Sequence, residues 1–340
     1  MSLPRLFASL AIVAVPVVAH AEAAGPTMVI ARDATAPAAI VGGTTAAVGD
    51  FPTVVAITVG GGLCTGTLIH PEWVLTAAHC IDPALIGVAT QAQVTASITV
   101  RFDSTSALGG GMMVAAIDSK PNPNFSQNAL GDDDIGLIRL ALPMTDRPVS
   151  PINRDPGAAP VGVTVTQVGY GLTDAGNQGS AGILHVVDGK ASIACSGFGF
   201  DDDLMLCFDQ TDGRGQCGGD SGGPVFADID GVQTVVGVVS FGDMQCSILG
   251  ANTRVDAEVA FADQHIGADL RCVENDVCDE GCDGDDPDCA GGPDDDGGAD
   301  TSDGGGCCQA GAGDAQTSAL LVGFGAVLLA ARRRRRVTAR

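Results

Sequence analysis

The chain has 340 residues, of which 17 are basic and 41 acidic, so its formal net charge is −24. This acidity argues against nucleic acid as a partner, because affinity for a duplex needs Lys and Arg on the phosphates. An apolar content of 45% excludes a chain that is disordered throughout, and twelve cysteines argue against a reducing compartment.

The charge is arranged in blocks along the chain. Residues 1–39 are neutral overall, and residues 40–265 carry 24 acidic and 8 basic side chains. Residues 266–331 carry 15 acidic side chains and one arginine, and the last nine residues carry six arginines. Such blocks indicate segments with different roles.

The N-terminus has the pattern of a secretory signal peptide. Arg5 supplies a positive start, residues 6–18 an apolar segment, and residues 19–21 a small-x-small cleavage site. A membrane span is the alternative, but the apolar segment is shorter than the roughly 20 residues that a span needs. We therefore predict a signal peptide at 1–21, a pro-segment at 22–39 and an exported protein.

From residue 40 the sequence changes to short β-branched runs bounded by Gly, Pro, Asn and Asp. This spacing predicts an all-β sandwich or barrel, with one helix near 257–265 at its end. We place the domain at 40–267. The predicted strands include 53–59, 94–102, 161–168 and 232–240.

Four motifs follow one another in this domain: Ile-Val-Gly-Gly at 40–43, Thr-Ala-Ala-His-Cys at 76–80, Asp-Ile-Gly-Leu at 134–137 and Gly-Asp-Ser-Gly-Gly-Pro at 219–224. Singly, each has an ordinary structural explanation, such as core packing, a charge at a strand end or a turn. A serine becomes a strong nucleophile only when an imidazole takes its proton and a carboxylate orients that imidazole. The chain offers one candidate of each kind.

Together the motifs resemble the chymotrypsin-fold, trypsin-like serine proteases over roughly residues 40–265. The resemblance implies a double six-stranded antiparallel β-barrel with a short C-terminal helix. It assigns His79 as general base and then general acid, Asp134 as the group that orients His79, and Ser221 as the nucleophile. Hydrolysis of a peptide bond would pass through an acyl-enzyme on Ser221.

The same resemblance assigns the groups around the nucleophile. The amides of Gly219 and Ser221 would form the oxyanion hole, and glycine is needed at 219 because a Cβ would obstruct the turn. Ser240 resembles the serine that hydrogen-bonds the catalytic aspartate, and Phe241 replaces the tryptophan that usually follows it.

Asp220 has another implied role, which makes the chain a zymogen. In the family this carboxylate pairs with the new α-amine of the Ile-Val-Gly-Gly terminus, which here is Ile40 after a cut between Ala39 and Ile40. We expect an activating protease that is not of the trypsin type, because Ala39 precedes the cut where many relatives have Arg or Lys.

The family's substrate pocket falls on Gly215 at its base and on Gly242 and Gly250 at its walls, with Gln216 and Ser240 beside them. No acid stands at the base, so a preference for Arg or Lys is not expected. An open, uncharged pocket predicts cleavage after medium or large apolar residues such as Leu, Met or Phe, unless Gln216, Asp243 or Met244 intrudes.

Six cysteines lie within the domain, and spacing alone allows fifteen pairings. Zinc is the alternative to disulfides, but this set contains no Cys-x-x-Cys pair. The resemblance implies the pairs Cys64–Cys80, Cys195–Cys207 and Cys217–Cys246.

After the domain we predict a Cys/Asp-rich module at 268–289 and a Gly/Asp linker at 290–306. Two disulfides among its four cysteines are the favoured interpretation of the module. Calcium is an alternative because hard oxygen ligands cluster there, although the EF-hand spacing is absent. We predict no other cofactor and no metal in the protease domain.

Residues 307–340 contain a cysteine pair, a short apolar run and the arginine cluster. This order resembles myxobacterial C-terminal sorting signals, which implies sorting machinery as a partner and retention at the cell surface or outer membrane. A plain membrane anchor is the alternative, though thirteen apolar residues are few for a span.

The sequence thus predicts a secreted or cell-surface serine endopeptidase that acts on proteins or peptides. The rival hypothesis is a catalytically silent homologue that serves as a surface binding protein or adhesin. Silent homologues usually lose Ser, His or Asp, and this chain retains all three.

Overall fold

The computed structural model describes residues 28–30, 40–128, 131–177 and 179–267. The predicted signal peptide, most of the predicted pro-segment and the three predicted segments after residue 267 lie outside the described residues. Within the described part of the chain, no helix has the length and apolar character needed to cross a membrane.

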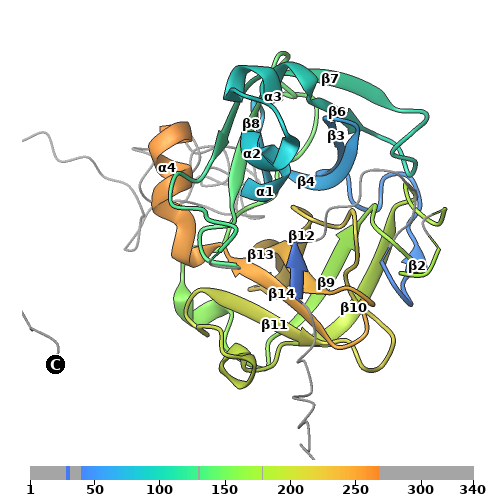
Figure 1. Ribbon diagram of the computed structural model, residues 1–340, viewed down its shortest axis with the longest axis vertical. Helices are drawn as coiled ribbons and strands as arrows, with labels where there is room; N and C mark the ends of the chain where they lie inside the picture. Colours follow the sequence, from blue (N-terminus) through green and yellow to red (C-terminus); the bar gives the residue numbers. More distant parts are fainter. Residues whose placement is uncertain (1–27, 31–39, 129–130, 178, 268–340) are drawn as a thin grey trace, which may run out of the picture. The chain divides into compact units, whose positions relative to one another are not determined.

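Six antiparallel strands form a closed barrel in the order β3-β4-β5-β8-β7-β6 (Figure 1). Its first hairpin joins β3 to β4 through Gly60 and Gly61, which have φ of 56° and 87°. Positive φ at both turn residues is the geometry that two-residue hairpin turns need. The six strands are β3 (Val54–Val59), β4 (Gly62–His70), β5 (Trp73–Thr76), β6 (Thr99–Phe102), β7 (Met112–Pro121) and β8 (Gly136–Leu140).

The second half of the domain is a sheet in the order β11-β14-β13-β12-β9-β10-β2, and β1 pairs with β13 beside this path. This sheet is open rather than a closed barrel, although an isolated bridge joins Ile193, two residues after β10, to Cys207 of β11. The strands are β1 (Met28–Ile30), β2 (Thr44–Thr45), β9 (Thr164–Gly169), β10 (His185–Ala191), β11 (Met205–Asp209), β12 (Pro224–Ile229), β13 (Val232–Asp243) and β14 (Leu249–Arg254).

Helices are short, and the last one confirms the expected C-terminal helix: α4 spans Val259–Ile266. Three others were not expected, namely α1 (Ala78–Ile81), α2 (Pro83–Ile86) and α3 (Gln91–Ser97). The prediction of one strand over 94–102 is wrong in its first half, because Val94 belongs to α3. A capping box between Thr90 and Gln93 starts that helix. The prediction relied on the β-branched residues alone and did not take this helix start into account. Single 3₁₀ turns cover Pro156–Ala158, Cys195–Phe198 and Asp256–Glu258.

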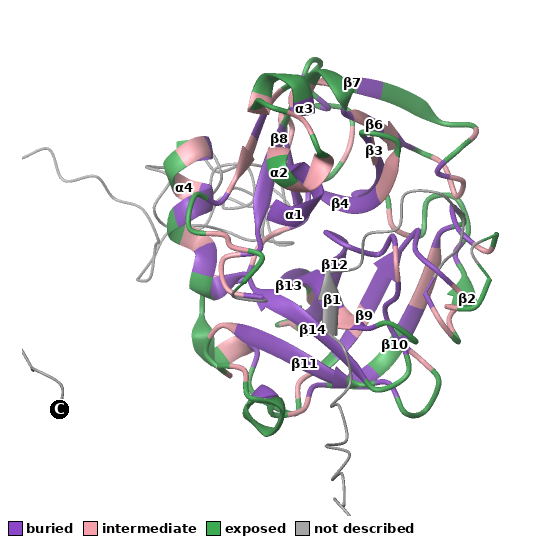
Figure 2. Ribbon diagram, in the orientation of Figure 1, coloured by how far each residue is buried: buried purple, intermediate pink, exposed green. Residues whose placement is uncertain are grey.

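The largest hydrophobic core continues from the barrel into the second sheet. Val55 and Leu75 of the barrel belong to the same buried cluster as Phe226 and Val238 of the sheet. The rings of Phe51 and Phe226 stack with their centroids 6.5 Å apart. Buried residues therefore run along the facing strands of both halves (Figure 2). The predicted all-β architecture is confirmed. Its two halves pack against each other, and an active site can lie at their junction.

Candidate active site

The three predicted catalytic residues come from both halves of the domain. His79 lies in α1 directly after β5, and Asp134 lies two residues before β8. Ser221 lies in the turn that leads into β12 of the second sheet. All three side chains belong to fully buried residues. Contact between the two halves therefore completes the site.

Asp134 is held by His79 and Ser240. Its Oδ1 accepts the backbone N–H of His79 at 2.9 Å, and its Oδ2 lies 2.7 Å from the ring Nδ1 of His79. The hydroxyl of Ser240 also donates to Oδ2. Burial alone would raise the pKa of Asp134, but the charge of His79 and the hydrogen bonds from His79 and Ser240 hold it below its ordinary value. The carboxylate is therefore ionised at neutral pH.

This arrangement fixes the direction in which His79 can act. With Nδ1 facing the carboxylate, Nδ1 carries the proton and Nε2 has the lone pair that a general base needs. The Nε2 atom is buried and has no hydrogen-bond partner in the described part of the chain. Catalytic hydrogen bonds often tighten only when substrate is bound, so this nitrogen is placed to receive the proton of a nucleophile.

The turn that holds the nucleophile depends on a glycine conformation. Gly219 has φ of 91°, and a Cβ at this position would lie 3.0 Å from the Cα of Gly171. Thr65 of β4 holds the turn, since its hydroxyl donates to the Gly219 carbonyl at 3.0 Å and its N–H donates to the Ser221 carbonyl at 2.8 Å. Sequence reasoning missed Thr65, because its role depends on a contact across 154 residues.

Asp220 is completely buried and accepts backbone N–H groups from Gly171 at 2.6 Å and Cys217 at 2.9 Å. Burial raises the pKa of Asp220 to about 7, and the two hydrogen bonds oppose that rise. No Lys, Arg or His of the described residues forms an ion pair with it. The carboxylate thus lacks the cation that a buried charge requires.

Two glycines make room for this carboxylate, and sequence reasoning missed them too. A Cβ at Gly169 would lie 2.2 Å from Asp220 Oδ1, and one at Gly171 would lie 2.3 Å from the Asp220 carboxyl carbon. Ile40 is also buried, and the next residue, Val41, exchanges two backbone hydrogen bonds with Gly215. The Ile-Val-Gly-Gly segment therefore lies beside the predicted base of the substrate pocket.

Three disulfides join the cysteine pairs that the resemblance implies. Cys64 of β4 is linked to Cys80 of α1, so the bridge anchors the helix that contains His79. The ligand atoms of Cys64, Cys80 and His79 lie within 4.8 Å of one another. Because the two sulfurs are bonded to each other, neither is a thiolate that could bind a metal.

The predicted pocket residues lie together. Gly242 of β13 pairs with Gly250 of β14, and the side chain of Gln216 reaches the backbone on both strands. Asp243, at the end of β13, is not a pocket acid. Burial would raise its pKa, but backbone N–H groups of residues 247–249 lower it and use its oxygens.

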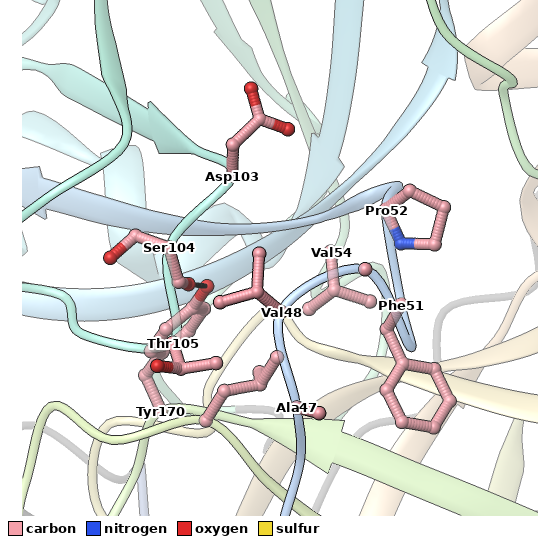
Figure 3. A pocket seen from close by; sticks show the side chains of 11 residues that line it. Ala47, Val48, Phe51, Pro52, Val54, Asp103, Ser104, Thr105 and Tyr170 are labelled. Atoms are coloured by element: carbon pink, nitrogen blue, oxygen red, sulfur yellow. Dashed lines mark hydrogen bonds between the residues drawn. The ribbon is translucent and has the colours of Figure 1, made fainter.

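A separate hollow lies away from these residues (Figure 3). Phe51 and Tyr170 lie on its walls, and the Tyr170 hydroxyl donates to the backbone oxygen of Ser104 at 2.5 Å. None of the predicted catalytic or pocket residues lines it. The candidate active site formed by His79, Asp134 and Ser221 is therefore distinct from this hollow.

Comparison with known proteins agrees with this geometry. The family model described as Trypsin matches residues 40–264. The chain is 32% identical to Brachyurin of Leptuca pugilator over 53% of this chain and 75% of that protein. It is 31% identical to Trypsin, alkaline C of Manduca sexta, over 64% and 88% of the two chains. Trypsin alpha-4 of Lucilia cuprina is 29% identical, over 60% and 77%.

The family match covers more than half of the chain and contains His79, Asp134 and Ser221. The relatives named above carry the names of proteases, and the fold is the all-β chymotrypsin fold with one closed barrel and one open half. The chain belongs to the trypsin family and is a serine endopeptidase that acts on protein or peptide substrates.

Proposed function

We propose that this endopeptidase is exported, is made as a zymogen and cleaves after uncharged residues through an acyl-enzyme on Ser221. The contact between Asp134 and His79 carries the catalytic part of this proposal. A buried carboxylate at 2.7 Å from Nδ1 orients the imidazole and stabilises the imidazolium that forms when His79 takes a proton.

Export is supported by the signal-peptide pattern at 1–21 and by the three disulfides. Disulfides persist in oxidising compartments and are rare in the cytosol. For the C-terminus we propose retention at the cell surface by sorting machinery acting on residues 307–340, and a plain membrane anchor is the alternative. C-terminal mass analysis of the mature protein separates the two, because retention of Arg340 excludes the sorting hypothesis.

The zymogen proposal is supported by the surroundings of Asp220. In the uncut chain this buried carboxylate has no cation among the described residues, whereas a cut between Ala39 and Ile40 creates an α-amine at a residue that is already buried. An ion pair between the two would fix the Cys217–Ser221 turn. Intact-mass analysis of active enzyme should find Ile40 as the first residue, and full activity with residues 22–39 attached would exclude the zymogen.

Specificity for uncharged residues is supported by the absence of an acid at the pocket base, where Gly215 stands. The carboxylate of Asp243 accepts backbone N–H groups from residues 247–249 and so caps the loop after β13, rather than replacing an acid at the pocket base. A peptide library that showed strong preference for Arg or Lys would contradict this part of the proposal.

The experiment that tests catalysis is active-site labelling. A fluorophosphonate probe should label the processed protein and should fail to label the Ser221→Ala variant. A matched control is Ser196→Ala, because Ser196 is exposed in the 3₁₀ turn Cys195–Phe198 and should leave labelling unchanged. Absence of labelling in correctly processed wild-type protein would instead favour the silent binding protein.

A further inference from the structure

The side chain of Gln216 lies across the base of the predicted substrate pocket. It is 3% exposed, and its Nε2 donates to the backbone oxygens of Phe241 at 2.8 Å and Ala251 at 3.1 Å. Its Oε1 accepts the amide of Gln167 at 3.0 Å. The side chain thus bridges β13 and β14 and is also hydrogen-bonded to Gln167 of β9.

The Gln216 amide occupies the space beside the pocket wall. A Cβ at Gly250 would lie 2.8 Å from Gln216 Cδ and 2.4 Å from Gln210 Oε1. A Cβ at Gly215 would lie 2.5 Å from Gln210 Oε1. Two glutamine side chains therefore fill the room that glycine at the base and at one wall would otherwise leave open.

Displacing Gln216 would be costly. It would break the three hydrogen bonds that Gln216 makes with Phe241, Ala251 and Gln167 in a buried region, where lost hydrogen bonds are not replaced by water. Gln210 fills further space beside Gly215 and Gly250, and its Oε1 is already buried without a hydrogen-bond partner within the described part of the chain. A large apolar side chain of a substrate would have to displace Gln216 to reach the pocket base, and this offsets the free energy gained by burying that side chain.

We propose that Gln216, held by Gln167, makes the pocket shallow, so that the enzyme cleaves after small residues such as Ala rather than after Leu, Met or Phe. This inference rests on the proposed catalytic function, and it narrows the proposed specificity for uncharged residues. It also fits the predicted activation site, because Ala39 stands before the cut.

Peptide substrates that differ only in the residue before the scissile bond test this inference. With active sites counted by fluorophosphonate titration, kcat/KM for Ala should exceed that for Leu and Phe by at least about tenfold. Gln216→Ala should open the base and raise kcat/KM for Leu and Phe by at least about tenfold. Gln167→Leu should shift the profile in the same direction by a smaller factor.

Gln233→Ala is the matched control, since Gln233 is an exposed residue of β13 far along the strand from the pocket, and its profile should equal the wild-type profile. A wild-type preference for Leu or Phe, or an unchanged profile in Gln216→Ala, would overturn the inference while labelling remained intact. Loss of labelling in wild type would instead contradict the proposed catalytic function.

A different observation concerns the start of the described chain. Strand β1 pairs antiparallel with the end of β13, with Met28 opposite Asp243, Val29 opposite Gly242 and Ile30 opposite Phe241. In Figure 1, β1 is the dark blue arrow near the labels of β12, β13 and β14. Part of the predicted pro-segment thus forms a strand of the catalytic domain's own sheet.

The edge that β1 occupies is the one beside the nucleophile. Strand β14 covers the other edge of β13 as far as Gly242, and β12 pairs with β13 only as far as Val238. Between β12 and β1 on the same edge lies the Ser221 turn, which is fixed by the hydrogen bond from Gly222 N–H to the Val239 carbonyl at 2.7 Å. An extended peptide bound at this edge lies next to the reacting groups.

We infer that residues 28–30 occupy the strand position that a substrate peptide needs, so that the pro-segment inhibits the enzyme until it leaves. Main-chain hydrogen bonds to a sheet edge are a general way to bind an extended peptide. This inference rests on the proposed zymogen. It gives the uncut chain a second reason to be inactive, besides the ion pair between Ile40 and Asp220 that forms only after the cut.

A synthetic peptide of residues 22–39 tests this inference against enzyme that begins at Ile40. It should inhibit competitively, and a Val29→Pro peptide should be at least about tenfold weaker, because Pro removes an N–H and fixes φ. Thr35→Pro is the matched control, since it leaves residues 28–30 unchanged, and it should inhibit like the wild-type peptide.

Three results would overturn the inference: no inhibition up to about 1 mM, equal inhibition by the Val29→Pro peptide, or rapid cleavage of the peptide during the assay. Mass spectrometry of the assay mixture reports the last of these. Fluorophosphonate titration of the same enzyme preparation distinguishes these results from a failure of catalysis itself.

Discussion

The carboxylate of Asp134 holds His79 at two points, because Oδ1 accepts the backbone N–H and Oδ2 faces the ring Nδ1. The first contact fixes the position of α1 and the second fixes the rotation of the ring. A neutral amide at this position could keep the packing but could not stabilise an imidazolium. Replacing Asp134 by a neutral amide therefore tests its catalytic role separately from its role in packing.

Asp134→Asn should lower kcat/KM by about 10⁴-fold, because an amide in this geometry favours the wrong tautomer of His79. The melting temperature should change little, since the side-chain volume is kept. Asp133→Asn is the control: Asp133 has φ of 55°, which Asn tolerates, and it faces Asn122 rather than His79. Equal activities of the two variants would contradict the assignment of Asp134.

Gly219→Ala should lower kcat by about 10²–10³-fold with a smaller effect on KM. The added Cβ must fit at φ of 91° and 3.0 Å from Gly171 Cα, so the turn shifts and its amide leaves the position where the oxyanion develops. Gly189→Ala tests strain alone, because Gly189 also has positive φ but meets nothing within 4 Å. Steady-state kinetics of both variants makes the comparison.

Stability of the uncut protein should fall as pH rises from about 4 to about 7. The pKa of Asp220 is raised to about 7 in the fold, so between these pH values the folded chain binds a proton that the unfolded chain has lost. A chain that begins at Ile40 should show a weaker dependence, since its α-amine would pair with the carboxylate of Asp220. Thermal melts at pH 5 and pH 8, in a Ser221→Ala background that prevents autolysis, measure the difference.

Adding Asp220→Asn to the uncut Ser221→Ala chain should remove the part of the pH dependence that comes from Asp220. The melting temperatures at pH 5 and pH 8 should therefore move closer together, while the part that comes from Glu258 remains. Identical pH profiles for the cut and uncut chains would contradict the ion pair between Ile40 and Asp220.

Glu258→Gln should stabilise the protein at pH 8 and change little at pH 4. Burial and the charges of Asp133 and Asp132 raise the pKa of Glu258 to about 7, against the opposing effect of the hydrogen bond from Asn122. Stability from the protonated carboxyl is therefore lost as pH rises from about 4.5 to 7. Glutamine can still accept the Asn122 amide, which lies 2.9 Å from Glu258 Oε2. Urea unfolding at the two pH values tests this, with Glu72→Gln as the surface control.

Trace amounts of mature enzyme should cut the inactive Ser221→Ala precursor between Ala39 and Ile40. A shallow pocket accepts Ala, so the enzyme is expected to process its own precursor in trans. Ala39→Phe should slow this cut by at least about tenfold in wild-type enzyme and much less in Gln216→Ala. N-terminal mass analysis of the precursor over time follows the reaction, and no cut by wild type would contradict the expectation.

Much of the site could be predicted from local sequence, because its candidate catalytic residues lie in short motifs. His79, Asp134 and Ser221 each lie at the end of a strand or in the turn beside one, and their neighbours in sequence fix those turns. Gly219 could be predicted because its left-handed backbone is a local property. The helix over Gln91–Ser97 was missed because its capping box decides it, while Val94 suggested a strand.

Other features could not be predicted, because they depend on contacts between distant residues. Thr65 holds the Ser221 turn, and the glycines at 169 and 171 make room for Asp220, yet nothing near them in sequence indicates it. For the pocket, glycine at the base predicted an open space unless Gln216, Asp243 or Met244 intruded, and the sequence did not decide between these outcomes. Gln216 and its partner Gln167, which are 49 residues apart, meet only in the folded sheet.

By itself the sequence indicated the family, the three candidate catalytic groups, the cysteine set and the acidic charge, because each depends on residue types and short spacings. Only the tertiary structure decided that one half closes as a barrel while the other stays an open sheet. It alone showed that Asp220 is buried without a cation among the described residues. It also showed that Gln216 is hydrogen-bonded to β13 and β14, and that residues 28–30 pair with the edge of β13 beside the Ser221 turn. The physical reason is that burial, hydrogen bonding and strand pairing bring together groups whose distance along the chain carries no information about their distance in space.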